Sequence, residues 1–397
     1  MREVYADHAA TTPVAPGVLA AMEPFFGAAF GNPSSVHRRG EAARDAVEEA
    51  RARVAALIGA LPQEIVFTAS GSEANNLALK GVLGGGESGR AGAQVRHRLV
   101  VSAIEHPSVL ETARHLEARG VAVTRVPVGP DGIVDLERLK QALAPDVALV
   151  SVMWVNNEVG TIQPVPEIAA AAHAVGALMH CDAVQAAGRI PLAVGEADVD
   201  LLTLAGHKLG GPPGAAALYV RRRLRLVPLV HGGHQERSRR AGTEDLPAIV
   251  GLGMAAERTV GRVAAGEPAR LGALGERLRA GLLAAVPGTR LNGDRERRVP
   301  TIMNLCFGGV DGEALLHELD RQGIAVSTGS ACSAATPGPS HVLTAMGLRP
   351  EDAHASVRFS LGEGNDPADI DWILEATPAA VARLRALQPP AAVRRSA

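Results

Sequence analysis

The chain has 397 residues, of which 47% are hydrophobic, 21% are charged and 3% are aromatic, and its formal net charge is −2. A chain of this length and apolar content can bury a large core in two or three domains. The balanced charge and the few aromatic rings argue against a surface for nucleic acid. The absence of a run of about 18 apolar residues argues against a membrane span.

The three cysteines, Cys181, Cys306 and Cys332, are odd in number and far apart. They therefore predict neither a disulfide framework nor a zinc site. This cysteine usage, together with an N-terminus that does not resemble a signal peptide, fits a reducing cytoplasm. Cys181 and Cys306 lie in apolar strand-like runs, so we interpret both as core residues.

Short apolar runs alternate with helical patterns through the first 220 residues. The predicted strands cover 64–68, 98–103, 121–126, 147–153, 177–181, 200–205 and 214–220. The predicted helices cover 41–58, a segment ending near 82, 108–118, 135–143 and 165–175. This alternation, with strands that are apolar almost throughout, predicts an α/β fold whose seven-stranded, mostly parallel sheet lies between helices.

The pattern changes from about residue 246. Two long helices are predicted, and they lead to a mixture of strands and helices typical of a smaller α+β domain. The long helices are predicted at 246–262 and 268–285, and two later helices at 312–322 and 367–386. The strands are predicted at 300–307, 324–326 and 355–361. We assign 16–260 to the large domain and 1–15 with 261–386 to the small one, and we expect 387–397 to be a disordered tail.

Two polar side chains follow strands of the predicted sheet. Asp182 ends the strand near 177–181, and Lys208 follows the strand near 200–205. Ligands of open α/β sheets collect at the carboxyl ends of strands. Most lysines are solvated and most strand-end aspartates cap helices, so neither residue is informative alone. Together they match the needs of pyridoxal phosphate (PLP), which bonds to a lysine and pairs its ring nitrogen with an acid.

A phosphate-binding turn is also predicted. Residues 68–73 join a strand to a helix start and contain Gly71 and Ser72. Exposed N–H groups and the positive end of the helix dipole favour an anion there. The alternative is an ordinary serine N-cap with a glutamate near the third helical position, and the two interpretations are compatible.

Two further segments contain candidate ligand contacts. His106 either stacks on the cofactor ring and handles protons, or merely precedes a helix whose first turn holds Pro107. Asn157 lies in 155–160, which either places an amide near the ring or is a simple turn.

Arg358 lies on a predicted strand in which Val357, Phe359 and Leu361 share the opposite face. If the arginine side is covered, an unpaired guanidinium would be costly, and the carboxylate of an amino acid would satisfy it. The alternative is an arginine that faces solvent.

Cys332 differs from the other two cysteines because its neighbours are glycine, serine and proline. Residues 327–340 show no apolar periodicity, which predicts an exposed, mobile loop. A cysteine displayed on such a loop can attack as a thiolate, whereas the alternative is an incidental surface thiol.

Together these segments resemble the cysteine desulfurases, PLP enzymes of the class V aminotransferase family and of fold type I. The resemblance runs from about Tyr5 to about Ala386. It rests on YADHAATTP at 5–13, GNPSS at 31–35, EH at 105–106, VNNE at 155–158, DAVQ at 182–185, GHK at 206–208, RAGT at 240–243 and RFS at 358–360. GSAC at 329–332 resembles the group with the longer catalytic loop, the housekeeping and nitrogen-fixation type.

The resemblance implies a role for each matching residue. The catalytic residues would be Lys208, Cys332 and His106. The cofactor contacts would be Lys208, Asp182, Gln185, Asn157, His106, Gly71, Ser72, Ala205, His207 and, from the second subunit of a dimer, Thr243. The substrate carboxylate would be bound by Arg358 with Asn32 and Asn157.

Two departures from the family pattern stand out. Ala205 replaces a serine that often contacts the phosphate, so one hydrogen bond is in doubt. The C-terminal tail shows no counterpart of the family's scaffold-docking segment, so how a partner docks stays open.

The resemblance implies removal of sulfur from L-cysteine, with L-alanine as product and a persulfide on Cys332, which could also act as a transient iron–sulfur ligand. The implied partners are a second copy of the chain and a sulfur acceptor, either an iron–sulfur scaffold or a thiolation relay. The alternatives are a selenocysteine lyase, an aminotransferase of the same fold, or a non-catalytic assembly subunit.

Overall fold

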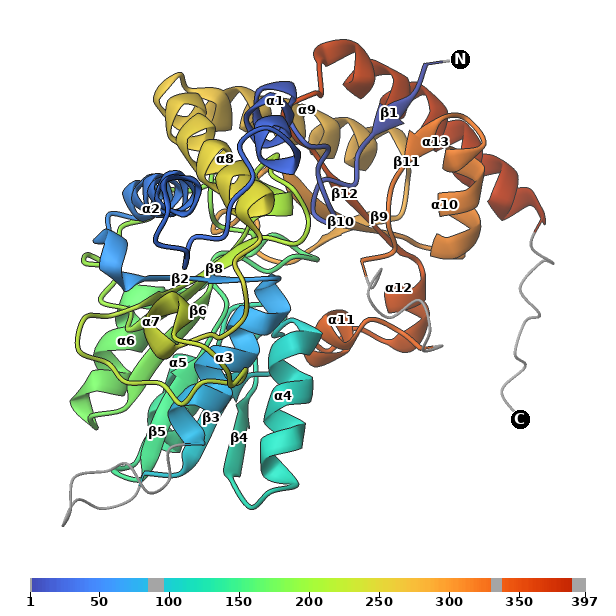
Figure 1. Cartoon of the computed structure of the whole chain (residues 1–397). Coiled ribbons are helices and arrows are strands. Elements are labelled where there is room, and N and C mark those ends of the chain that lie inside the picture. Colours follow the sequence, from blue (N-terminus) through green and yellow to red (C-terminus); the bar gives the residue numbers. More distant parts are fainter. Residues whose placement is uncertain (1, 85–95, 330–337, 388–397) are drawn as a thin grey trace.

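The computed structural model describes residues 2–84, 96–329 and 338–387. A seven-stranded sheet forms the centre of the larger part of the molecule (Figure 1). The strand order is β2–β8–β7–β6–β5–β3–β4, and β8 alone runs against its neighbours. The strands are β2 (Ile65–Thr68), β3 (Arg98–Ser102), β4 (Ala122–Val126), β5 (Val147–Ser151), β6 (Leu178–Asp182), β7 (Leu201–Ala205) and β8 (Ala216–Val220). The predicted α/β class and the mostly parallel sheet are confirmed.

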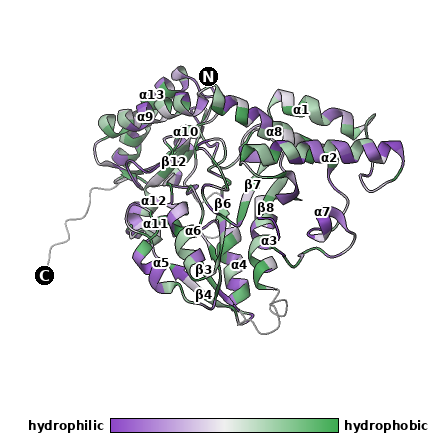
Figure 2. Cartoon of the chain, turned by 90° about the vertical axis from the view of Figure 1, so that its left-hand side faces the viewer, coloured by the Kyte–Doolittle hydropathy of each residue, from purple (hydrophilic) through white to green (hydrophobic). Residues whose placement is uncertain are grey.

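Helices cover both faces of this sheet. Alternate residues of a strand point to opposite faces, so Val100 packs into one apolar cluster while Leu99 and Val101 pack into another. Figure 2 shows that the flanking helix α2 carries both hydrophobic and hydrophilic residues along its length, as expected of a helix with one buried face. The covering helices are α2 (Arg38–Leu57), α3 (Gly71–Leu83), α4 (Pro107–Glu117), α5 (Leu136–Ala142), α6 (Val165–Ala174) and α8 (Leu246–Ala264).

A second, smaller sheet has the antiparallel order β12–β10–β9 and packs with three helices. The first strand of the chain, β1, pairs with β11 and adds Val4 to the same core. The elements are β1 (Val4–Tyr5), β9 (Thr289–Asn292), β10 (Ile302–Phe307), β11 (Ile324–Ala325), β12 (Ser356–Ser360), α9 (Glu267–Ala285), α10 (Gly312–Asp320) and α13 (Pro367–Leu387). We propose these elements as the small domain and 16–260 as the large one. All but the first residue of the tail 387–397 lies outside the described residues.

Several short elements escape prediction. Each is seven residues or fewer, too short for a hydrophobic period to stand out. They are β1, β9, α1 (Pro16–Met22), η1 (Glu23–Phe26), η2 (Pro62–Glu64), η3 (Gly206–Lys208), α7 (Gln235–Ser238), α11 (His341–Ala345) and α12 (Pro350–His354). Within the described ranges, no helix combines the length and the apolar character needed to cross a membrane.

Candidate active site

The carboxyl ends of β6 and β7 and the first turns of α3 and α4 border one cavity of about 410 Å³. This is the edge of an open α/β sheet at which ligands bind. The predicted residues that line it are Gly71, Ser72, His106, Asn157, Asp182, Gln185, Ala205, His207, Lys208 and Arg358. Residues more than 280 positions apart in sequence thus share one site.

Asp182 is the last residue of β6 and is held by two donors. Its Oδ1 accepts from the backbone N–H of Val184 at 3.0 Å, and its Oδ2 accepts from Nδ2 of Asn75 at 2.8 Å. Asn75, on α3, also donates to Oγ of Ser108 at 2.8 Å. The carboxylate therefore has a fixed orientation. Sequence reasoning missed Asn75, because an asparagine inside a helical pattern carries no signal of its own.

Lys208 lies in η3, directly after β7, and its ammonium group faces the N-terminal segment. Its Nζ donates to the carbonyl oxygens of Ala9 at 2.6 Å and Ala10 at 2.5 Å. Gln185 donates from Nε2 to the same Ala9 oxygen at 2.8 Å. The Oε1 atom of Gln185 is buried and has no hydrogen-bond partner among the described residues. A ligand donor placed in the cavity would satisfy it.

The first turn of α3 forms the predicted anion-binding turn. Ser70 caps the helix, since its Oγ accepts from the N–H of Glu73 at 3.1 Å, so the ordinary N-cap interpretation is correct. The same turn lines the cavity through Gly71 and Ser72. A Cβ at Gly71 would lie 3.3 Å from Cγ2 of Val184, so glycine keeps the turn close to β6. The capped first turn of α3 therefore also forms part of the cavity wall.

His106 caps α4 and lines the cavity at once. Its Nδ1 accepts from the N–H of Ser108 at 3.1 Å, and Pro107 follows as the first helical residue. Burial lowers the pKa of the imidazole, and the charges of Lys208 and His341 lower it further, against the opposing effect of Asp182. Burial also lowers the pKa of His207 to about 4. Both rings are therefore uncharged at neutral pH.

The residue before His106 in the sequence carries a buried carboxyl group. Glu105 has no exposed surface, and burial raises its pKa to about 8. Its Oε1 accepts from the N–H of Met153 at 2.9 Å and from the Ser102 hydroxyl. His341, which also lines the cavity, hydrogen-bonds through Nε2 to the Glu105 carbonyl oxygen at 2.9 Å. His341 was missed because α11 is too short to be predicted.

Arg358 is only 2% exposed, so the alternative of an arginine facing solvent is wrong. One amino group donates to Oδ1 of Asp7 at 2.7 Å, and the other to the carbonyl oxygen of Asn157 at 2.9 Å. Its Nε is buried without a hydrogen-bond partner in the described part of the chain. The alternation that defined this strand is confirmed, because Val357 and Phe359 lie in the apolar core that packs on the smaller sheet.

Two of the predicted site residues that the structure describes are not brought to this cavity, and a third is not among the described residues. Asn32 lies outside it, where its Oδ1 accepts from the N–H of Ser34 at 2.8 Å, and Thr243 is exposed elsewhere. Cys332 lies outside the described residues. Cys181 and Cys306 are buried, as predicted, and burial raises the pKa of both thiols.

Comparisons with known proteins agree with the geometry. The aminotransferase class-V family matches residues 4–373. The cysteine desulfurase of Gluconacetobacter diazotrophicus is 45% identical to this chain, over 98% of this chain and 96% of the relative. The cysteine desulfurase of Cereibacter sphaeroides is also 45% identical, over 98% of this chain and 98% of the relative. A solved NifS-like protein superposes with a TM-score of 0.89 at 34% identity, over 96% of this chain and all of the other. The chain therefore belongs to the cysteine desulfurase group of the class V aminotransferase family.

Proposed function

We propose that this protein is a cysteine desulfurase that uses PLP to remove sulfur from L-cysteine and releases L-alanine. One observation carries the proposal. Asp182 ends β6 and Lys208 follows the neighbouring strand β7, and both line the same cavity as the anion-binding turn at Gly71 and Ser72. The relatives with the highest similarity reported above are named cysteine desulfurases, which supports the choice of reaction.

The donors and acceptors of the cavity fit PLP. Lys208 would hold the cofactor covalently, and the fixed carboxylate of Asp182 would pair with its ring nitrogen. The unpaired Oε1 of Gln185 would accept from the ring hydroxyl. Gly71 and Ser72, together with His207, would hold the phosphate, while Ala205 offers no hydroxyl. The uncharged His106 would cover the ring.

When bound, PLP supplies an electron sink that stabilises negative charge at the substrate Cα. The protein supplies the proton transfer and the orientation. The Lys208 amine would take the Cα proton, and the Ala9 and Ala10 carbonyl oxygens keep that amine at the wall of the cavity. The unpartnered Nε of Arg358 would donate to the substrate carboxylate.

Cys332 would receive the sulfur. Its thiolate attacks the substrate sulfur, an S–S bond forms as the C–S bond breaks, and the electron pair of the broken bond stays with the carbon that is protonated to alanine. Gly329, three residues before Cys332, lines the cavity and its carbonyl oxygen accepts from Arg358 at 3.4 Å. Three residues of chain span up to about 10 Å, which is enough to enter the cavity.

The proposal includes a homodimer and a sulfur acceptor. Thr243 does not reach the cavity of its own chain, so its predicted phosphate contact requires a second copy. Large apolar side chains are exposed on α1, at Leu19, and on the segment that joins α1 to α2, at Phe26, Phe30 and Val36. A partner chain would cover such a surface. The persulfide would pass to an iron–sulfur scaffold or a thiolation relay.

The test is alanine formation from L-cysteine by the PLP-saturated protein. Wild type is compared with Lys208→Ala and with Lys140→Ala, which removes a lysine on an exposed helix face. Loss of the lysine amine should reduce the rate by about 10²–10⁴-fold, the usual contribution of a positioned acid or base. Lys140→Ala should match the wild type. Wild-type turnover by Lys208→Ala would refute the proposal.

A further inference from the structure

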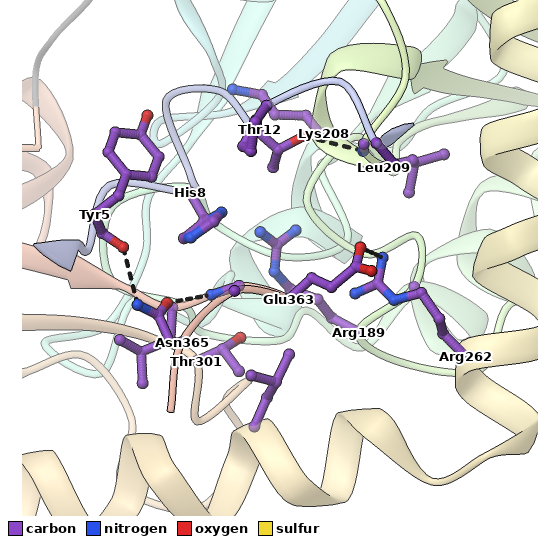
Figure 3. A pocket seen from close by; sticks show the side chains of 18 of the residues that line it. Tyr5, His8, Thr12, Arg189, Lys208, Leu209, Arg262, Thr301, Glu363 and Asn365 are labelled. Carbon is purple, nitrogen blue, oxygen red and sulfur yellow. Dashed lines mark hydrogen bonds and ion pairs between the residues drawn. The ribbon is translucent and has the colours of Figure 1, made fainter. Parts of the chain in front are cut away.

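A second and larger cavity, of about 1030 Å³, lies behind the N-terminal segment that contacts Lys208 (Figure 3). Its walls come from both parts of the molecule: η3 and α8 on one side, α9 and the end of β12 on the other. Its volume is at the upper end of small-molecule sites, which run from about 300 to 1,000 Å³. The proposed desulfurase chemistry uses none of its residues apart from Lys208.

One cation in this cavity has no counter-ion among the residues that the structure describes. Arg189 lines the wall, and among the described residues its guanidinium makes one hydrogen bond, from an amino group to the Gln185 carbonyl oxygen at 3.2 Å. The neighbouring Arg262 is neutralised, because Glu363 and Glu267 both pair with it. Burial lowers the pKa of Arg189 to about 10, and the positive charge of Arg262 adds to this effect. Arg189 is therefore a partly buried charge that stays protonated at neutral pH.

The remaining acidic groups of the wall do not reach Arg189. Glu363 is shared between Arg258 at 2.6 Å and Arg262 at 3.2 Å. Asp369 pairs with Arg2 at 2.7 Å, and Glu3 is exposed. In the part of the chain that the structure describes, no carboxylate lies within ion-pair distance of the Arg189 guanidinium.

Two buried polar side chains of the same wall are also unsatisfied. His8 and Thr301 are each 5% exposed, and Nδ1 of His8 and Oγ1 of Thr301 have no hydrogen-bond partner among the described residues. Figure 3 shows the His8 ring and the Arg189 guanidinium projecting into the same space. Burial lowers the pKa of His8 to about 4, so the ring is neutral at neutral pH. Buried polar atoms left unpaired are costly, which favours a ligand that pairs them.

We propose that this second cavity binds a small oxyanion ligand, a carboxylate or a phosphate, through the guanidinium of Arg189, with the Thr301 hydroxyl as a further donor. The planar guanidinium fork matches either group through two parallel hydrogen bonds. The site is independent of the proposed desulfurase reaction. Its ligand would lie next to the Ala9–Ala10 segment that Lys208 contacts.

The test is calorimetric titration of the PLP-saturated protein at constant ionic strength, because bound PLP fills the anion-binding turn of the first cavity. Inorganic phosphate and succinate are titrated separately, so the two sources of oxyanion are distinguished. The wild type should bind at least one of them at a saturable site. Arg189→Met should weaken that binding by about tenfold or more, as expected for loss of a charge-assisted contact.

Two controls locate the site. Arg321→Met removes an arginine whose side chain is 81% exposed and should leave the affinity unchanged. Arg358→Met removes the arginine of the first cavity, and binding at the second must survive it. If Arg189→Met does not fold, Thr301→Val gives the same test, with a weaker affinity expected. The proposal would be overturned if the wild type showed no saturable binding. It would also be overturned if the folded variants Arg189→Met and Thr301→Val bound the ligand as tightly as the wild type.

Discussion

Arg358 shows how one buried side chain links two parts of the molecule. It lies on β12 of the smaller sheet and lines the cavity at the edge of the large sheet. Its charge is already balanced by Asp7, and its remaining Nε has no hydrogen-bond partner within the described ranges. A guanidinium held in this way needs no reorganisation to receive a carboxylate, which suits recognition of an amino acid.

We expect Arg358→Ala to weaken cysteine use. Loss of one partner of a buried charge pair costs about 2–4 kcal/mol, so kcat/KM for L-cysteine should fall by about 30- to 1,000-fold. Steady-state alanine formation measures the effect. Arg349→Ala is the control, because that side chain is 68% exposed. If Arg358→Ala and the wild type had equal kinetic constants, Arg358 would not bind the substrate, and its role would be limited to the ion pair with Asp7.

At the scale of elements, the first turn of α3 combines a helix cap with a cavity wall. The turn fits under β6 and β7 because Gly71 has no side chain. A larger residue there would push against Val184 and Ala205 and move the N–H groups that are proposed to hold the phosphate.

Gly71→Val should therefore weaken PLP binding. We expect the dissociation constant of PLP to rise by about tenfold or more, since one hydrogen bond to a charged group contributes about 1.5–3 kcal/mol. Titration of the PLP-free protein, followed by visible absorbance, gives this constant. Gly261→Val makes the same change at a helical position with open space around it. If the two variants bind PLP equally well, the turn does not hold the phosphate.

The long elements could be predicted from sequence because their patterns are strong. All seven strands of the large sheet occur near the predicted positions, since their residues are apolar almost throughout. The strand ends then indicated Asp182 and Lys208. The short helix α11 with His341 could not be found, and neither could Asn75 or the pairing of Arg358 with Asp7. Those contacts depend on tertiary packing between segments far apart in sequence.

At the scale of the whole molecule, the site is expected to be completed by a second chain. Thr243 lies on the segment that follows α7, and Arg240 on the same segment pairs with Glu73 of α3 at 2.9 Å. The segment is therefore tied to the anion-binding turn but presents Thr243 outward. This arrangement suits a threonine that serves the neighbouring chain.

We expect a homodimer whose dissociation loosens PLP. Phe26→Asp combined with Phe30→Asp places two charges on the exposed apolar segment and should give a monomer with weakened PLP binding, because charges at an interface core oppose association. Sedimentation with absorbance detection reports mass and PLP content together. Leu61→Asp, at an exposed leucine elsewhere, is the control. A fully active, PLP-saturated monomer would refute the shared site.

The central claim is that the PLP site and a protein thiol act in sequence, and Cys332→Ala tests it most directly. PLP binding and removal of the Cα proton need Lys208 and Asp182 but no thiol, whereas sulfur removal needs a nucleophile. The variant should bind PLP and change its visible absorbance on addition of L-cysteine, yet form essentially no alanine and carry no persulfide. Cys306→Ala should still form alanine and carry the persulfide, with some loss of stability from the small cavity that the substitution leaves. Alanine release by Cys332→Ala at the wild-type rate would contradict the account.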